Sequence, residues 1–297
     1  MAAEGMLPVS SKKKIGTIGI ARRCVQLLML VLYALPLIVA GWGLLGGFVG
    51  GEEAATTPSD LPVWGSLSAS SIFGISLVDP FATLQTIVAS KQFAAAMVGA
   101  LPILIVYTLI RGRAFCGWIC PVNLVLEFVD WLRAKLGLKV AENPIPRKTK
   151  IFVAAGILVL SAITCVPLFE AVNPIGALSK ALLFGSVLGV WTLLAIIVAE
   201  LFWGRRVWCR SLCPLGGFYQ VLGAVGFVSV KIDSNACVRC GTCKKHCLCN
   251  SEILDKCIEG QSARVAAGDC MLCGKCVDSC PTKALSIGFA IPKNPEL

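Results

Sequence analysis

Apolar residues fall into four long blocks in the first two thirds of the chain, and polar residues prevail from about residue 230 onward. The blocks cover residues 24–47, 93–110, 151–169 and 182–202. Each has about the length of a helix that crosses a lipid bilayer, which takes roughly 17–25 residues. The pattern therefore predicts an α-helical membrane protein with four transmembrane helices, followed by a polar C-terminal domain.

Composition and charge support this expectation and add an orientation. Of the 297 residues, 56% are hydrophobic and only 15% are charged, which is too apolar for an ordinary globular enzyme. Basic residues precede the first block, fill the segment between the second and third, and follow the fourth, whereas segments 48–92 and 170–181 contain only Lys91 and Lys180. Because basic residues favour the cytoplasmic side, we expect both termini in the cytoplasm and the chain in the cytoplasmic (inner) membrane. This topology, together with contact with anionic lipid, explains the net charge of +10 without nucleic-acid binding.

The first two thirds of the chain contain a tandem repeat. RGRAFCGWICPVN at 111–123 matches GRRVWCRSLCPLG at 204–216, and VDPFATL at 78–84 matches VNPIGAL at 172–178. Repeat 1 covers about 24–121 and repeat 2 about 150–214. Each predicted repeat has two spans and ends in C-x3-C-P, so both cysteine pairs are expected on the same side of the membrane. We therefore divide the chain into a basic N-terminus at 1–23, a four-span membrane domain at 24–229 and a C-terminal domain at 230–297.

The two C-x3-C-P motifs provide four cysteines that can converge. Cysteines four positions apart share one helix face, and the proline behind the second favours a break or a new helix start. Four convergent thiolates suit a metal ion or an iron–sulfur cluster, and the neighbouring arginines favour the thiolate form. A reducible disulfide, a copper-handling dithiol and simple packing at helix ends remain open as alternatives. The four candidate metal-site residues are Cys116, Cys120, Cys209 and Cys213.

The C-terminal domain carries two cysteine runs with the spacing of a two-cluster bacterial ferredoxin. CVRCGTCKKHC and CMLCGKCVDSCP both have the pattern C-x2-C-x2-C-x3-C. In that arrangement the fourth cysteine of each run binds the other cluster. We expect Gly241 and Gly274 to allow the backbone close to each cluster. Neither structural zinc nor a disulfide framework in a reducing cytoplasm accounts for this repeated spacing. The predicted ligand sets are Cys237, Cys240, Cys243 and Cys280 for one 4Fe–4S cluster, and Cys270, Cys273, Cys276 and Cys247 for the other.

Some features depart from the ferredoxin pattern or exclude other cofactors. Leu248 stands where a proline usually follows the fourth cysteine, and Cys249 and Cys257 are left over. Three alternatives remain open: they are spare buried thiols, one of them replaces Cys247 as the fourth ligand, or the loop that carries them makes a further contact. The single histidine, His246, excludes a bis-histidine haem within the chain, and no haem-attachment or nicotinamide-binding motif is present.

The paired C-x3-C-P motifs, the four apolar blocks and the C-terminal ferredoxin runs together resemble the NapH/MauN family of membrane ferredoxin-type proteins. The resemblance implies a C-terminal α+β ferredoxin-like domain and a role as a quinol dehydrogenase component. Its implied partners are membrane quinol, a periplasmic NapG-type ferredoxin and a downstream periplasmic reductase, such as nitrate reductase. The cysteine pairs are also similar to those of NosR-type and CcoG-type polyferredoxins. The alternative function is therefore a metal-cofactor assembly or copper-reducing maturation factor, for which the scarcity of histidine and methionine near the cysteines is unfavourable.

A quinol gives up two electrons and two protons, so its site needs an apolar slot and a proton acceptor. The segments VDPFATLQTIVAS and VNPIGALSKALLF are expected to form short amphipathic helices that cover such a slot. Asp79 and Glu200 are the candidate catalytic proton acceptors. For Asp79, a role as the N-cap before Pro80 is the favoured alternative. For Glu200, the alternative is an ion pair with Arg205 or Arg206.

Overall fold

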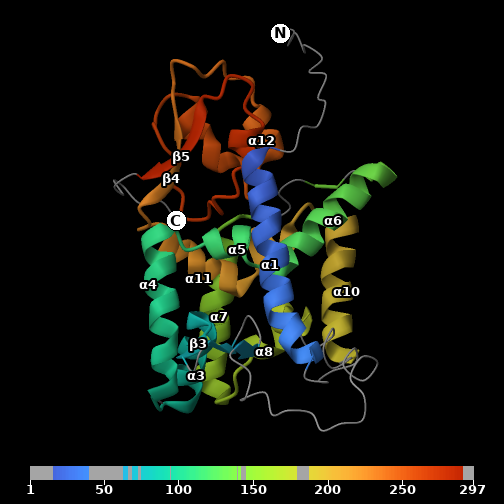
Figure 1. Ribbon diagram of the computed structural model, residues 1–297, viewed down its shortest axis with the longest axis vertical. Coiled ribbons are helices and arrows are strands. Elements are labelled where there is room, and N and C mark those ends of the chain that lie inside the picture. Colours follow the sequence, from blue (N-terminus) through green and yellow to red (C-terminus); the bar gives the residue numbers. More distant parts are fainter. Residues whose placement is uncertain are drawn as a thin grey trace.

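The computed structural model describes residues 16–39, 63–65, 69–72, 75–93, 95–138, 140–141, 145–178 and 187–289. Four helices run along the long axis of the molecule (Figure 1): α1 (Thr17–Val39), α4 (Ala100–Ile110), α7 (Thr149–Thr164) and α10 (Val187–Phe202). The C-terminal module lies at one end of these helices. Short helices that carry the C-x3-C-P motifs occupy the junction between the two parts.

The junction has the same construction in both repeats. In repeat 1, α5 (Ala114–Trp118) is followed by α6 (Pro121–Leu136), and in repeat 2 a π-helical turn, η3 (Trp208–Leu212), is followed by α11 (Pro214–Gly223). The proline of each motif begins the second helix, as its position in the sequence predicts. The N-cap residues are Cys120 (φ −59°, ψ 118°) and Cys213 (φ −65°, ψ 116°). The second cysteine of each pair is thus held in an extended conformation at a helix start.

The opposite end of the helices carries a small antiparallel sheet and short helices. The strands β1 (Val63–Gly65), β2 (Ala69–Ile72) and β3 (Ile75–Val78) follow one another in sheet order, with Ala69 opposite Val78. Three short helices accompany the sheet: α3 (Pro80–Ser90), η2 (Ala95–Gly99) and α8 (Phe169–Val172). The expected helix in VDPFATLQTIVAS is therefore present as α3. Of its counterpart, residues 179–184 lie outside the described residues.

The C-terminal module combines one antiparallel strand pair with short helices. Strand β4 (Val228–Ile232) pairs with β5 (Leu285–Phe289), and Val228 lies opposite Phe289. Cysteines and apolar residues form one continuous core in this module, which includes Leu248, Leu254 and Met271. The helices between the two strands are α12 (Thr242–His246), η4 (Ser251–Leu254), α13 (Asp255–Ile258) and α14 (Lys275–Asp278).

The prediction of four transmembrane helices is wrong. Among the described residues, no helix combines the length and the hydropathy needed to cross a membrane. The helices that occupy three of the apolar blocks are too short: α4 has 11 residues and α7 and α10 have 16 each. A 16-residue helix is about 24 Å long, compared with roughly 30 Å for the hydrocarbon core of a bilayer.

Local backbone signals explain why the helices differ from the apolar blocks. In the block 93–110, the 3-10 helix η2 takes up Ala95–Gly99, and the α-helix begins only after it. In the block 151–169, α7 ends at Thr164 because Cys165 adopts a left-handed conformation with φ 55°. Helix α1 begins before its block and includes Arg22 and Arg23, while residues 40–47 lie outside the described residues. The domain boundaries at 24 and 229 and the location in the inner membrane rest on the same blocks and stay predictions.

Gly217, at the contact between α7 and α11, gives a direct test of this packing. A Cβ atom at Gly217 in α11 would lie 2.2 Å from the carbonyl oxygen of Lys150, whereas a Cβ at Gly156 in α7 would have nothing within 4 Å. We expect Gly217→Ala to lower the free energy of unfolding by about 1–3 kcal/mol through overpacking. The control Gly156→Ala should leave it unchanged or raise it by about 0.5–1 kcal/mol. Chemical denaturation followed by circular dichroism measures both, and equal stabilities of the two variants would contradict the packing described.

Candidate metal centres

Two cysteine-lined cavities lie in the C-terminal module. The first, here called the outer cavity, is lined by the predicted set Cys237, Cys240, Cys243 and Cys280. Cys240 is exposed, so this cavity reaches the surface. Gly241, which precedes α12, has φ 69°, a conformation that favours glycine. The four thiols come from both cysteine runs, as the exchange of fourth ligands requires.

The second cavity, here called the inner cavity, is lined by the other predicted set, Cys270, Cys273, Cys276 and Cys247, and in addition by Cys249. All five of these cysteines are buried. The structure therefore brings together each set of four that the spacing predicted, with one further thiol at the inner cavity.

The four cysteines of the C-x3-C-P motifs line a third cavity, here called the repeat cavity. Cys116 comes from α5, Cys209 from η3, and Cys120 and Cys213 from the N-caps of α6 and α11. Arg113, Trp208 and Asn173 also line the cavity. The two repeats thus place their thiols around one space, as expected from the sequence.

The donor sets fit iron–sulfur clusters. Each cavity offers at least four cysteines, which is the ligand set of a 4Fe–4S cluster. Across the described residues, no three histidine, cysteine or carboxylate side chains lie close enough together to bind a single metal ion. The thiols are arranged around cavities instead.

The buried Arg113 joins the segments that surround the repeat cavity. Arg113, 1% exposed, donates from Nη2 to the carbonyl of Cys209 at 2.7 Å and from Nη1 to the carbonyl of Asp269 at 2.9 Å. It therefore joins the motif of repeat 1 to the motif of repeat 2 and to the C-terminal module. Burial alone lowers the pKa of Arg113, but the negative charges of Cys249, Cys116 and Asp269 outweigh it and raise this pKa above its usual value. The guanidinium accordingly stays charged beside the cysteines.

Direct hydrogen bonds join the motifs around the repeat cavity to the segments around the inner cavity. Trp118, between the two cysteines of the first motif, donates from Nε1 to the carbonyl of Leu272 at 3.0 Å. Arg210, between the two cysteines of the second motif, donates from Nη2 to the carbonyl of Cys247 at 3.1 Å. Both acceptors belong to the segments that line or adjoin the inner cavity. Each C-x3-C-P motif is thus in contact with the ferredoxin runs.

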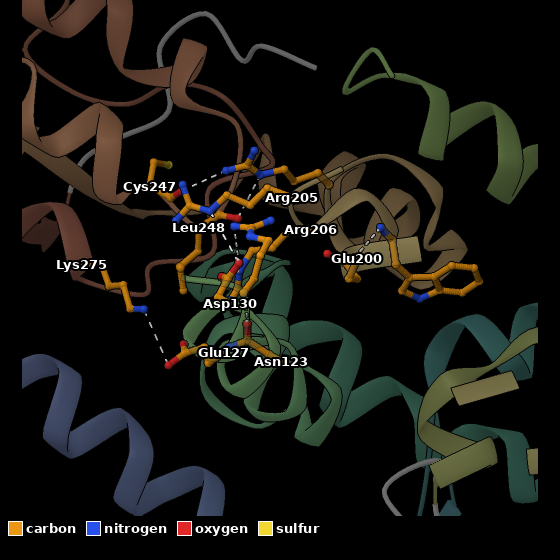
Figure 2. Close-up of polar contacts among 12 residues, drawn as sticks. Asn123, Glu127, Asp130, Glu200, Arg205, Arg206, Cys247, Leu248 and Lys275 are labelled. Atoms are coloured by element: carbon orange, nitrogen blue, oxygen red, sulfur yellow. Dashed lines mark hydrogen bonds and ion pairs between the residues drawn. The ribbon is translucent and has the colours of Figure 1, made fainter. Parts of the chain in front are cut away.

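A network of buried charges surrounds this junction (Figure 2). Glu127 forms ion pairs with Arg22 and, at 3.7 Å, with Lys275. Burial raises the pKa of Glu127, but Lys275, Arg22 and Arg206 lower it below its usual value overall. Asp130 pairs with Arg206 at 2.7 Å. The network joins α1 and α6 to Lys275, which lies between two cysteines of the inner cavity.

Sequence reasoning missed several of these buried partners. Glu127, Lys150, Asp269 and Lys275 are buried or half-buried charged residues in ion pairs. Their positions on separate elements carry no spacing signal along the chain. For Asp269 and Lys275, only the adjacency to Cys270 and Cys276 marks them in the sequence.

The two candidate proton acceptors both take part in local hydrogen bonds. Asp79 accepts from the backbone N–H of Phe81 at 3.0 Å and caps α3, which confirms its expected N-cap role. Asn173, at the matching position of repeat 2, accepts from Ile175 at 3.1 Å. Burial raises the pKa of Asp79 to about 7. A role of Asp79 in proton transfer stays a prediction.

Glu200 is buried near the end of α10 and accepts from the backbone N–H of Trp208 at 2.9 Å (Figure 2). Glu200 therefore holds the first residue of η3 through a hydrogen bond. Arg206, one of its two expected ion-pair partners, pairs with Asp130. Burial raises the pKa of Glu200 to about 7, although the hydrogen bond from Trp208 acts in the opposite direction. Its role as a proton acceptor also stays a prediction.

Comparison with known proteins agrees with this arrangement. A 4Fe–4S binding domain model matches the chain twice, at residues 93–139 and 184–233, and a second 4Fe–4S binding domain model matches residues 264–286. The methylamine utilization ferredoxin-type protein MauN of Methylorubrum extorquens is 35% identical over 250 residues, which are 82% of this chain and 84% of that protein. The ferredoxin-type protein NapH of Escherichia coli is 34% identical over 235 residues, or 76% and 80% of the two chains.

The chain belongs to the NapH/MauN family of ferredoxin-type proteins. As a member of this family it is an iron–sulfur protein with 4Fe–4S binding domains and a function in electron transfer. Each of the two matches of the first domain model contains one of the two C-x3-C-P motifs. The putative electron transport protein YccM of Escherichia coli is 29% identical over 212 residues, which are 67% of this chain and 57% of that protein. No solved structure matches the chain.

Because the carboxyl group of Asp79 is buried, we expect the free energy of unfolding of the protein to depend on pH. The pKa of this carboxyl group rises from 3.8 to about 7 on folding, so the folded protein binds the proton more tightly than the unfolded chain. The free energy of unfolding should therefore fall as pH rises from about 4 to about 7. Asp79→Asn keeps an N-cap acceptor, as Asn173 does, and removes this dependence. From pH 5 to pH 8, the variant should gain roughly 2–3 kcal/mol relative to the parent.

Urea denaturation at several pH values measures this difference. Asn173→Asp is the matched reciprocal variant, and it should acquire the dependence that Asp79→Asn loses. Parallel stability curves for the parent and Asp79→Asn would contradict the burial of an ionisable group at this position.

Proposed function

We propose that the chain is the electron-transfer subunit of a quinol dehydrogenase with three 4Fe–4S clusters, one in each cysteine-lined cavity. The clusters supply one-electron storage when bound. Quinol, which yields two electrons and two protons, is the proposed donor. A NapG-type ferredoxin and a downstream reductase, such as nitrate reductase, are the proposed acceptors.

One observation carries the proposal: the three cavities form a connected series. Cys280 from the second ferredoxin run lines the outer cavity, and Cys247 from the first run lines the inner cavity. Arg210 then connects the carbonyl of Cys247 to the motif that lines the repeat cavity. Because these contacts are direct, a centre in each cavity has a neighbouring centre in the next.

The buried charges favour electron uptake at the repeat cavity. Each added electron makes a thiolate-bound cluster more negative, and a buried positive charge offsets this at low dielectric. Arg113 lines the cavity, and Lys150 donates from Nζ to the carbonyl of Arg210 at 3.0 Å within the second motif. These residues provide the positive charge on both sides of the junction.

The names of the relatives support electron transport but differ in the pathway that they imply. MauN relatives are named for methylamine utilization, and YccM is named as a putative electron transport protein. A terminal acceptor other than nitrate reductase is therefore compatible with the proposed subunit. The chemistry within the chain is the same for either acceptor.

Anaerobic titration of the purified protein tests the donor. We expect a water-soluble menaquinol analogue to reduce part of the centres, seen as bleaching of the absorption of the clusters and as a new EPR signal. Dithionite defines full reduction. If dithionite reduces the protein and the quinol does not, the quinol role is wrong.

Copper binding by the same purified protein tests the alternative function, that of a copper-reducing maturation factor. Stoichiometric binding of Cu(I) that is lost in Cys116→Ser, and retained in the control Cys165→Ser, would favour copper handling over electron transfer. Cys165 is exposed and does not line the repeat cavity, so it controls for the loss of a thiol as such. The electron-transfer proposal expects no difference between these two variants in copper binding.

A further inference from the structure

The inner cavity has one more cysteine than a cubane cluster needs. Five cysteines line it, whereas a 4Fe–4S cluster binds four. Cys270, Cys273 and Cys276 form the C-x2-C-x2-C part of one run, which leaves a single ligand position for two candidates. These candidates are Cys247 and Cys249, which belong to the same short loop after α12.

Both candidates are buried and lie next to each other. Cys247 is 7% exposed and Cys249 is 2% exposed. The Sγ atom of Cys247 lies 3.5 Å from the carbonyl oxygen of Asn250. Both cysteines line the inner cavity, so either one is placed to supply the fourth sulfur.

The backbone that carries the two thiols is fixed from both sides. Arg210 donates to the carbonyls of Cys247 and Leu248 at 3.1 and 3.4 Å. On the other side, Asn250 accepts from the N–H of Glu252 at 3.0 Å and caps η4. Because the loop is held in place, an exchange between the thiols requires only a change in side-chain rotamer.

The remaining spare cysteine differs from Cys249 in its position. Cys257 is also 2% exposed and belongs to the same core, but it lies on α13 and not among the residues that line the inner cavity. Burial alone therefore does not distinguish the two residues. Placement at the cavity does, and it makes Cys257 a matched control.

We propose that Cys247 and Cys249 are interchangeable fourth ligands of the cluster in the inner cavity, an inference that rests on the presence of that cluster in the proposed function. The exchange changes no oxidation state. One iron–sulfur bond forms as another breaks, and the incoming thiol loses its proton while the outgoing thiolate gains one, so that charge and protons balance within the cavity that both cysteines line. The missing proline after Cys247 is consistent with a loop that has to present two thiols.

Iron and acid-labile sulfide per chain, with EPR of the reduced proteins, test the proposal. The set comprises the parent, Cys247→Ser, Cys249→Ser, the double variant and the control Cys257→Ser. We expect both single variants and the control to retain the iron content of the parent. The double variant should lose about four irons, because only then is the fourth ligand absent. The two single variants should also differ from each other in the EPR signal of this cluster.

Loss of about four irons in either single variant, equal to that of the double variant, would overturn the proposal by showing that this one cysteine is the sole fourth ligand. The EPR signal of the outer cluster serves as an internal standard for folding, and a serine variant that lacks this signal is replaced by its alanine counterpart and scored in the same way. If the parent itself holds no cluster at the inner cavity, the double variant will match it in iron content. That result overturns the proposed function together with the exchange, whereas failure of the exchange alone is visible only in the single variants.

Discussion

The arrangement of the cysteines depends on arginines that are buried at the junction and donate to main-chain carbonyls. Arg111 donates to the carbonyls of Val228, Val265, Ala266 and Ala267. Arg113 donates to the carbonyls of Cys209 and Asp269. Arg210 donates to the carbonyls of Cys247 and Leu248. A buried guanidinium loses its hydration and has to be compensated by hydrogen bonds and nearby negative charge. The carbonyls provide the hydrogen bonds, and Asp269 and the thiolates provide the negative charge. The three donors fix the repeats and the C-terminal module relative to each other, and with them the three cavities.

The two repeats are built alike but differ where they meet the C-terminal module. In repeat 1 the residues between the cysteines form an α-helical turn, and Trp118 contacts Leu272. In repeat 2 they form a π-helical turn, and Arg210 contacts the loop of Cys247. π-helical turns occur frequently at functional sites. The thiols are arranged alike in the two repeats, but the contacts of the two motifs differ. The first motif contacts the second cysteine run, and the second motif contacts the first cysteine run.

The sequence predicted the site better than it predicted the fold. Cysteine spacing predicted which thiols line a common cavity, because short intervals such as C-x2-C leave few ways to place the thiols. The prolines Pro121 and Pro214 mark the helix starts correctly. Hydropathy was a poor guide to helix length. The 3-10 helix at Ala95–Gly99 and the left-handed Cys165 end the α-helices inside apolar blocks. The ion pairs of Glu127 and Asp269 were not predictable, because they join elements far apart in the chain. The fifth thiol at the inner cavity, Cys249, was visible in the sequence but required the structure to be placed.

The central claim is that the four C-x3-C-P cysteines hold a cluster between the repeats. Iron and acid-labile sulfide per chain, measured on anaerobically purified parent protein and on a variant with Cys116, Cys120, Cys209 and Cys213 changed to serine, test it most directly. Cys24→Ser/Cys165→Ser is the control, because both residues are exposed and neither lines any of the three cavities described above. The account predicts roughly twelve irons in the parent and the control and about eight in the fourfold variant. About eight irons in all three proteins would contradict it.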